Sequence, residues 1–292
     1  MSTKSRISQG RPSDDLVAVV TGAARGIGQA IARKLGAAGD RLVLCDVDGT
    51  ALGHVADTLG PRHRYVVADV TDVRTPQRLI TEAMHHYGRV DVWVNNAGIL
   101  PTGKLTDQPR SLVDHTIAVN LTALCHGSQA ALTTMYEQGS GHLINIASAS
   151  AVKPMAGMAA YSATKAGVLA LSEALRREAR PHGIHVSAVL PTLIDTRLAH
   201  GIRLPCHLTP QPPTAVADAV LELLTHPTSR RYIPRWLGWL LPWTGLLPTR
   251  LLDRADDLLR TDAIGCAPLP GQRSAYEAAL AGDAGGDTRP VT

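Results

Sequence analysis

Six short apolar runs, separated by longer amphipathic stretches, recur through the first two thirds of the chain. They are Leu16–Gly22, Arg41–Asp46, Arg64–Asp69, Val90–Gly98, Gly141–Ser148 and Gly183–Pro191. The runs are rich in Val, Ile and Leu without strict apolar–polar alternation, which is typical of strands covered on both faces. Connected by helices, beginning with one from about Ile27 to Ala38, such strands predict an α/β fold with a doubly wound parallel sheet.

The chain is expected to form one domain over residues 15–234, with a seventh short strand near Arg231–Pro234. Residues 1–14 are polar, and we expect a flexible N-terminus there. A Trp- and Leu-rich extension follows at residues 235–262. Residues 263–292 are rich in Gly, Ala, Asp and Pro, and we expect a loosely ordered tail.

Composition and charge argue against several functions. The 292 residues carry a net charge of +4 without a dense Lys/Arg block, so we do not expect a nucleic-acid partner. The four cysteines are far apart and match no metal-ligand spacing, which favours a reducing cytoplasm and no metal site. The chain shows neither a signal peptide nor an apolar run of about 18 residues, so we expect no membrane-spanning helix.

The first apolar run leads into a glycine-rich turn at the start of a helix. Glycines there permit a tight turn and let backbone N–H groups approach a pyrophosphate, and the helix N-terminus adds a favourable partial positive charge. An ordinary strand–helix turn is the alternative for this feature taken alone. The candidate contacts are Gly22, Arg25, Gly26, Ile27 and Gly28.

Asp46 ends the second predicted strand, 18 residues after Gly28. A carboxylate in that place accepts hydrogen bonds from the hydroxyls of an adenosine ribose and repels the 2′-phosphate of NADP. Arg25 would favour NADP instead, because its guanidinium would pair with that phosphate. Since Asp46 would touch the ribose directly, we expect NAD to be preferred over NADP.

Five motifs follow one another along the chain: Thr21–Gly28, Asn95–Gly98, Asn120, Ser148 and the stretch "YSATK" at Tyr161–Lys165. In this order and spacing the chain resembles the short-chain dehydrogenase/reductase family, without a break from Leu16 to Thr196. The resemblance implies a three-layer Rossmann fold. It also implies an oxidoreductase that acts on a CH–OH group with NAD or NADP.

The chemistry of the residues agrees with this resemblance. A free tyrosine with a pKa of about 10 is a poor base at neutral pH, but a lysine one helical turn away favours the phenolate. Tyr161 is therefore expected to be the general acid/base, with Lys165 lowering its pKa. By the resemblance, Lys165 also binds the nicotinamide ribose, Ser148 donates to the substrate oxygen, and Asn120 holds a water that links Lys165 to solvent. The plainer alternative is a packed tyrosine and a solvated lysine.

The resemblance implies further cofactor contacts. Asp69 and Val70 match positions that contact the adenine, although Asp69 is also suited to cap the next helix. Three residues of the second motif match positions that line the cofactor and brace the sheet: Asn95, Ala97 and Gly98.

The stretch Pro191–Thr196 resembles the family's Pro-Gly-x-x-x-Thr element, which contacts the nicotinamide carboxamide. Pro191, Ile194 and Thr196 are its candidate contacts, and Thr192 stands where the family has glycine. The following residues, about 196–215, correspond to the family's mobile substrate lid. Three residues there are interpreted as lid residues rather than metal ligands: His200, Cys206 and His207.

The extension holds Trp236, Trp239 and Trp243 at helical spacing, but Pro242 would kink or end a helix there. Residues 251–259 predict a further, amphipathic helix. Three interpretations stay open. The extension packs on the domain or on another subunit, forms a wall for a bulky apolar substrate, or makes peripheral membrane contact through Trp236–Trp243.

These features predict an NAD(P)-dependent, cytoplasmic oxidoreductase that interconverts a secondary alcohol and a ketone on a hydrophobic, steroid- or lipid-like substrate. A β-ketoacyl reductase of fatty-acid metabolism and a non-catalytic dinucleotide-sensing protein are the alternatives. By the resemblance, a helix face of small residues favours a homodimer or homotetramer. That face comprises Ala163, Ala166, Gly167, Ala170 and Ala174.

Overall fold

The structure is a computed structural model that describes residues 15–202, 209–259 and 261–266, together with residues 273, 276 and 280. The expected flexible N-terminus, residues 203–208 of the expected lid and most of the expected tail lie outside the described residues. Cys206 and His207 lie outside them as well.

Seven strands form one sheet. They are β1 (Val17–Thr21), β2 (Arg41–Asp46), β3 (Arg64–Val67), β4 (Val92–Asn95), β5 (Gly141–Ile146), β6 (Ile184–Pro191) and β7 (Arg230–Ile233). Their order is β3-β2-β1-β4-β5-β6-β7, and every neighbouring pair is parallel. Each predicted strand, including the seventh, and the predicted α/β fold are confirmed. The strand order reverses between β1 and β4, where doubly wound sheets bind ligands at the carboxyl ends of their strands.

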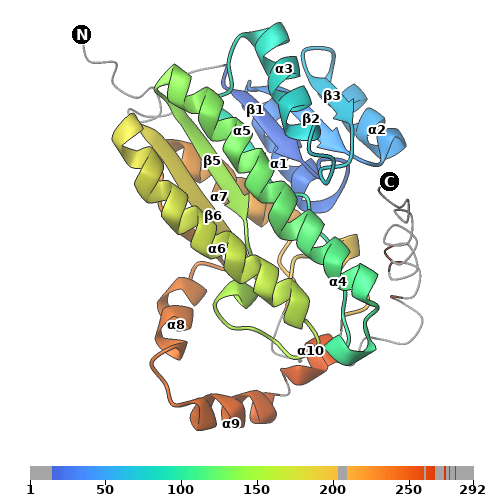
Figure 1. The fold of residues 1–292 in the computed structure, drawn as a ribbon, viewed down its shortest axis with the longest axis vertical. Coiled ribbons are helices and arrows are strands. Elements are labelled where there is room, and N and C mark those ends of the chain that lie inside the picture. Colours follow the sequence, from blue (N-terminus) through green and yellow to red (C-terminus); the bar gives the residue numbers. More distant parts are fainter. Residues whose placement is uncertain are drawn as a thin grey trace, which may run out of the picture.

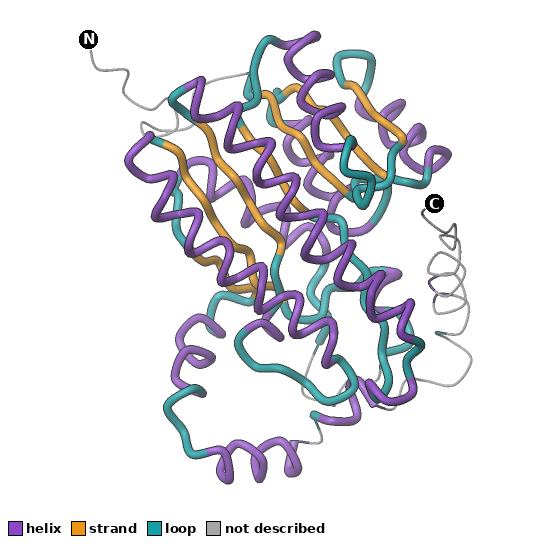
Figure 2. Tube along the Cα trace, in the orientation of Figure 1, coloured by secondary structure: helices purple, strands orange, loops and turns teal. Residues whose placement is uncertain are grey.

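Helices cover both faces of this sheet, so the domain has three layers (Figures 1 and 2). The helices of the domain are α1 (Gly26–Ala37), α2 (Gly49–Leu59), α3 (Thr75–Tyr87), α4 (Arg110–Ile117), α5 (Ala123–Gln138), α6 (Ala159–Ala179) and α7 (Pro213–Thr225). One apolar core joins the sheet to α1, α2 and α7. A second core joins the other face to α3, α5 and α6. The three-layer arrangement expected from the resemblance is thereby confirmed.

Strand β3 departs from the expectation that the apolar runs are covered on both faces. Tyr65 and Val67 are 48% and 46% exposed. The reason is position, since β3 is the outermost strand and pairs only with β2. Val and Tyr favour strands through their shape as well as through burial, so an apolar run alone does not distinguish an edge strand from a central one.

The extension forms two short helices beyond the sheet (Figure 1), α8 (Leu237–Thr244) and α9 (Thr249–Leu259). A third, α10 (Asp262–Cys266), falls almost entirely in the described start of the expected tail. Pro242 lies inside α8, and Leu237 and Leu241 join the apolar cluster of β6 and β7. Many apolar side chains of this region face solvent, namely Trp236, Trp239, Leu240, Trp243, Leu246, Leu247, Leu251, Leu258 and Leu259. Among the described helices, none is long and apolar enough to cross a membrane.

Candidate active site

A cavity of about 600 Å³ lies at the carboxyl edge of the sheet, between the turns that follow β1, β2, β4, β5 and β6. Most of the predicted site residues lie on its wall: Gly22, Arg25, Gly26, Ile27, Asp46, Asp69, Val70, Ala97, Gly98, Ser148, Tyr161, Lys165, Pro191, Ile194 and Thr196. Three predicted residues do not line this cavity, namely Gly28, Asn95 and Asn120. Residues far apart in the sequence therefore meet because parallel strands end at one edge.

The glycine turn needs its glycines for geometric reasons. Gly22 and Gly26 have φ angles of +65° and +52°, in the left-handed region that favours glycine. A Cβ atom on Gly28 would lie 2.0 Å from the Gly22 carbonyl oxygen, so α1 begins directly behind the turn. Backbone N–H groups and a helix N-terminus, approachable where the glycines carry no side chains, fit a pyrophosphate.

Asn96 fixes this turn against the end of β4. Its side-chain amide donates to the carbonyl oxygens of Thr21 (2.9 Å) and Gly22 (3.0 Å). The Thr21 hydroxyl in turn accepts from the backbone N–H groups of Asn96 (3.0 Å) and Ala97 (3.2 Å). Asn96 was not among the predicted site residues, and its position inside the second motif is the signal in the sequence that points to it.

Asp46 holds its carboxylate at the end of β2 through backbone bonds. It accepts from the N–H groups of Ala24 (2.9 Å) and Asp48 (3.1 Å). The guanidinium of Arg25 pairs with the carboxylate of Asp48, which is the helix cap of α2. Both residues line the cavity, but the Arg25 side chain has an acidic partner within the protein.

Ser148 follows β5 and presents its hydroxyl to the cavity. Its oxygen accepts from both the backbone N–H (3.1 Å) and the hydroxyl (3.0 Å) of Ser150. With its oxygen accepting two bonds, the Ser148 hydroxyl is directed to donate outward. A hydrogen bond with Ser148 lowers the pKa of Tyr161, which is the direction expected when Ser148 donates to the phenol oxygen. Ser150 is a residue that the sequence analysis missed.

Lys165 is buried, and its ammonium donates to the carbonyl oxygen of Ile146 at 2.9 Å. Burial lowers the pKa of Lys165 to about 8. The ammonium lies 5.7 Å from the centroid of the Tyr161 ring. The pKa of Tyr161 is raised to about 12, with burial as the largest cause. Burial of the phenol raises this pKa by more than the hydrogen bond with Ser148 lowers it, and the lowering by Lys165 stays a prediction.

Asn120 lies in one turn of π-helix, Ala118–Thr122, between α4 and α5. Its side-chain oxygen accepts from the Ile99 N–H (2.8 Å), and its amide donates to the Ile99 carbonyl (2.9 Å) and the Thr164 hydroxyl (3.3 Å). The side chain thereby ties the segment after β4 to the helix that carries Lys165. Turns of π-helix are frequent at functional sites, where they aim a side chain inward.

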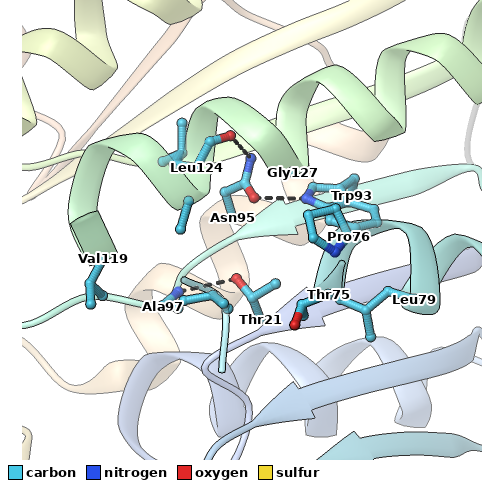
Figure 3. A pocket seen from close by; sticks show the side chains of 12 residues that line it. Thr21, Thr75, Pro76, Leu79, Trp93, Asn95, Ala97, Val119, Leu124 and Gly127 are labelled. Carbon is cyan, nitrogen blue, oxygen red and sulfur yellow. Dashed lines mark hydrogen bonds between the residues drawn. The ribbon is translucent and has the colours of Figure 1, made fainter. Parts of the chain in front are cut away.

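Asn95 faces a smaller, separate cavity on the α3 and α5 side of the sheet (Figure 3). Its oxygen accepts from the Trp93 indole (2.7 Å), and its amide donates to Asn145 (2.9 Å) and Ser128 (3.0 Å). These bonds join β4, β5 and α5. Asn95 therefore has the bracing position expected from the motif, while its side chain points away from the large cavity.

The remaining predicted contacts lie at two turns. Asp69 accepts from the Thr71 N–H at 2.8 Å, so its carboxylate both stabilises the turn after β3 and lines the cavity. Thr192 has no left-handed backbone, since the only described non-glycine residue with positive φ is Asp15. Its N–H donates to the Ile233 carbonyl at 2.9 Å, and the replacement of glycine is accommodated without strain.

The comparisons agree with this geometry. The family model described as "short chain dehydrogenase" matches residues 16–206. The chain belongs to the short-chain dehydrogenase family. It is 36% identical over 212 residues to an uncharacterized oxidoreductase of Staphylococcus epidermidis, covering 73% of this chain and 92% of the relative. An uncharacterized oxidoreductase of Staphylococcus aureus is 39% identical over 214 residues, with the same coverage.

The fold has a counterpart among solved structures. A 3-ketoacyl-(acyl-carrier-protein) reductase from Brucella melitensis, complexed with NADH, matches with a TM-score of 0.70 at 24% identity, covering 76% of this chain and 98% of that one. This likeness shows the fold, and family membership makes the chain an oxidoreductase.

Several cavity residues of this short-chain dehydrogenase carried no recognisable sequence signal. They are His115, Met155, Met158, Ile264, Tyr276 and Leu280. The last three lie beyond the family's shared region, so only the fold places them. His200, a predicted lid residue, does not line the cavity, and the described residues contain no group of three or more His, Cys, Asp or Glu suited to a metal ion.

We call the glycine turn Gly22–Gly28 the pyrophosphate cradle, and substituting one of its glycines tests its expected role. In Gly28→Ala the new methyl would overlap the Gly22 carbonyl, so we expect NAD affinity to fall by more than about tenfold in a calorimetric titration. The matched control is Gly53→Ala in α2, where a Cβ meets nothing within 4 Å. That variant should keep its NAD affinity and gain about 0.5–1 kcal/mol of stability from the higher helix propensity of alanine. Equal affinities in the two variants would contradict the pyrophosphate cradle.

Proposed function

We propose that this short-chain dehydrogenase interconverts a secondary alcohol and a ketone on a hydrophobic, steroid- or lipid-like substrate, with Tyr161 as the general acid/base. The observation that carries the proposal is the meeting of Ser148, Tyr161 and Lys165 on the wall of one large cavity. The side chains around them are mostly apolar and suit an apolar substrate body. They include Leu100, Met155, Met158, Leu193, Leu198 and Ile264.

The cofactor would lie across the carboxyl edge of the sheet. In the proposal the glycine turn binds the pyrophosphate, Asp46 the adenosine ribose, and Asp69 and Val70 the adenine. The segment Pro191–Thr196 would hold the nicotinamide end. When bound, the oxidised nicotinamide supplies the acceptor for the hydride that leaves the carbinol carbon.

The chain's own residues handle the proton. In oxidation, Ser148 would donate a hydrogen bond to the substrate oxygen while Tyr161 takes the hydroxyl proton. In reduction, Tyr161 returns a proton to the carbonyl oxygen. With a pKa of about 8, Lys165 is mostly charged at neutral pH, and its cation would stabilise the phenolate as it forms. Asn120 would hold a water that links Lys165 to solvent.

Replacing the phenol tests this mechanism. Tyr161→Phe should lower the rate of NAD-linked oxidation of a hydrophobic secondary alcohol by roughly 100- to 10,000-fold, the range of general acid–base catalysis. Its NAD affinity should stay close to that of the wild type, because the pyrophosphate cradle is unchanged. Absorbance of the reduced nicotinamide follows turnover, and calorimetry follows binding. Tyr136→Phe, on the outer end of α5, is the matched control, and unchanged turnover in Tyr161→Phe would overturn the proposal.

We propose NAD rather than NADP as the preferred cofactor. The carboxylate of Asp46 lines the cavity and would face the adenosine ribose, where its negative charge would repel a 2′-phosphate. Arg25, the residue best placed to offset that repulsion, pairs with Asp48. A clear NADP preference would instead favour the alternative of a β-ketoacyl reductase.

The cofactor preference has its own test. Asp46→Asn removes the charge while keeping an acceptor for the Ala24 N–H, so kcat/KM with NAD should fall about tenfold and kcat/KM with NADP should rise, with each tenfold worth about 1.4 kcal/mol. Asp57→Asn, an exposed carboxylate on α2, should leave both values unchanged. A constant NAD/NADP ratio in Asp46→Asn would contradict the role of Asp46.

We also propose that the chain forms a homodimer or homotetramer through the small-residue face of α6. Ala163, Ala170 and Ala174 are exposed on that helix in the single chain, which leaves room for a second helix to approach closely. For the extension we propose peripheral membrane contact, because an exposed apolar patch with three tryptophans is typical of an interfacial segment.

A flotation experiment tests the membrane contact. The wild-type chain should float with phosphatidylcholine vesicles, and the double variant Trp239→Ser, Trp243→Ser should remain in the dense fraction. Val73→Ser removes an exposed apolar side chain elsewhere and should float like the wild type. Light scattering without vesicles reports the oligomer in each variant. A wild-type chain that fails to float while remaining oligomeric would refute the lipid contact and leave the α6 contact standing.

A further inference from the structure

Two residues beyond the family's shared region lie at the proposed substrate site. Arg273 is 2% exposed, and Tyr276 lines the large cavity. The family model ends at residue 206, so neither residue belongs to the family's common part. They come from the stretch that the sequence predicts to be loosely ordered.

Arg273 connects two separate parts of the cavity wall. Its guanidinium donates to the carbonyl oxygen of Leu100, after β4, and to those of Leu198 (3.0 Å) and His200 (3.1 Å), after β6. Leu100 and Leu198 line the cavity themselves. A planar guanidinium with five donors in fixed directions suits such a junction, whereas a lysine ammonium would not span it.

Tyr276 is held in place by the same junction. Its phenol oxygen accepts from the Leu100 N–H at 3.0 Å, and Arg273 donates to the Leu100 carbonyl oxygen. Tyr276 and Arg273 therefore bind both polar groups of the Leu100 backbone. The Arg273 guanidinium carbon lies 4.9 Å from the centroid of the Tyr276 ring, within the range of a cation–π contact. Tyr276 and Tyr161 both line the large cavity, so the ring of Tyr276 faces the space that holds the proposed reacting centre.

We infer that Tyr276 contacts the body of the substrate and selects for bulky apolar alcohols and ketones, and that Arg273 is the residue that positions it. The inference rests on the proposed function for its substrate class. Its physical basis is that an aromatic ring offers a large apolar area with few rotatable bonds, and this ring is fixed by two contacts. Buried Leu280 adds a second apolar side chain from the same stretch to the cavity wall.

The test compares a large and a small apolar ketone, methyl octyl ketone and butanone, on the full chain with NADH. Tyr276→Ala should weaken binding of methyl octyl ketone about tenfold in calorimetry and raise its KM by a similar factor, because an aromatic contact is lost. For butanone, which is too small to fill the cavity, binding and KM should stay near the wild-type values. For both ketones kcat should change little, since Tyr161 keeps the proton transfer.

Two milder variants separate positioning from folding. Tyr276→Phe keeps the ring and loses only the acceptor for the Leu100 N–H, so its KM for methyl octyl ketone should lie between those of the wild type and Tyr276→Ala. Arg273→Lys keeps the charge but cannot bond the carbonyl oxygens of Leu100, Leu198 and His200 together. It should raise KM for the large ketone without changing NADH affinity. Arg177→Gln, an exposed arginine on α6, is the control and should match the wild type.

The outcomes are distinguishable. Unchanged binding of methyl octyl ketone in Tyr276→Ala overturns the inference, whether or not the chain shows turnover. Equal weakening for both ketones also overturns it, because selection by size would be absent. If the wild-type chain binds the large ketone more tightly than Tyr276→Ala but reduces neither ketone, the contact stands and the proposed function fails.

Discussion

The close approach of the β1–α1 turn to the end of β4 is the contact on which the site depends. A Cβ on Gly22 would lie 2.8 Å from the Ala97 Cα, and the Asn96 amide bonds two carbonyl groups of the same turn. Strands β1 and β4 are neighbours at the point where the strand order reverses. Because this junction is held by backbone and by the half-buried amide of Asn96, a cofactor would meet a surface that is formed before it binds.

The acid–base pair has a different physical basis. Burial alone disfavours both the phenolate of Tyr161 and the ammonium of Lys165, and it moves their pKa values in opposite directions. The polar contacts of Ser148 and Ile146 partly offset that cost. The two groups therefore become a useful pair only within this arrangement of β5 and α6, which brings a strand end and a helix side together.

The sequence was most informative where local chemistry and spacing are linked. The strands and the glycine turn could be predicted because buried strands appear as apolar runs and tight turns as closely spaced glycines. Exposure of Tyr65 in β3 was not predictable, since it depends on which strand lies at the edge of the sheet. The direction in which Asn95 points, and the pKa of Tyr161, depend on packing between distant elements.

Arg273 in the C-terminal stretch is a stronger example of a contact between distant elements that the sequence does not predict. Its composition predicts little order, yet Arg273 is buried and bonds three carbonyl groups of distant loops. A single arginine in a Gly- and Ala-rich segment gives no periodic signal, and its partners are backbone atoms without side-chain identity. Such a contact is visible only once the fold has placed the loops.

The two outer strands have a consequence for how copies of this chain associate. β3 and β7 are each four residues long and begin with arginine, at Arg64 and at Arg230–Arg231. Short, charged outer strands resist open-ended addition of further strands, because each added chain finds few backbone partners and meets a fixed positive charge. Open-ended growth of the sheet from copy to copy is therefore disfavoured, and the proposed homo-oligomer would form through helix surfaces instead.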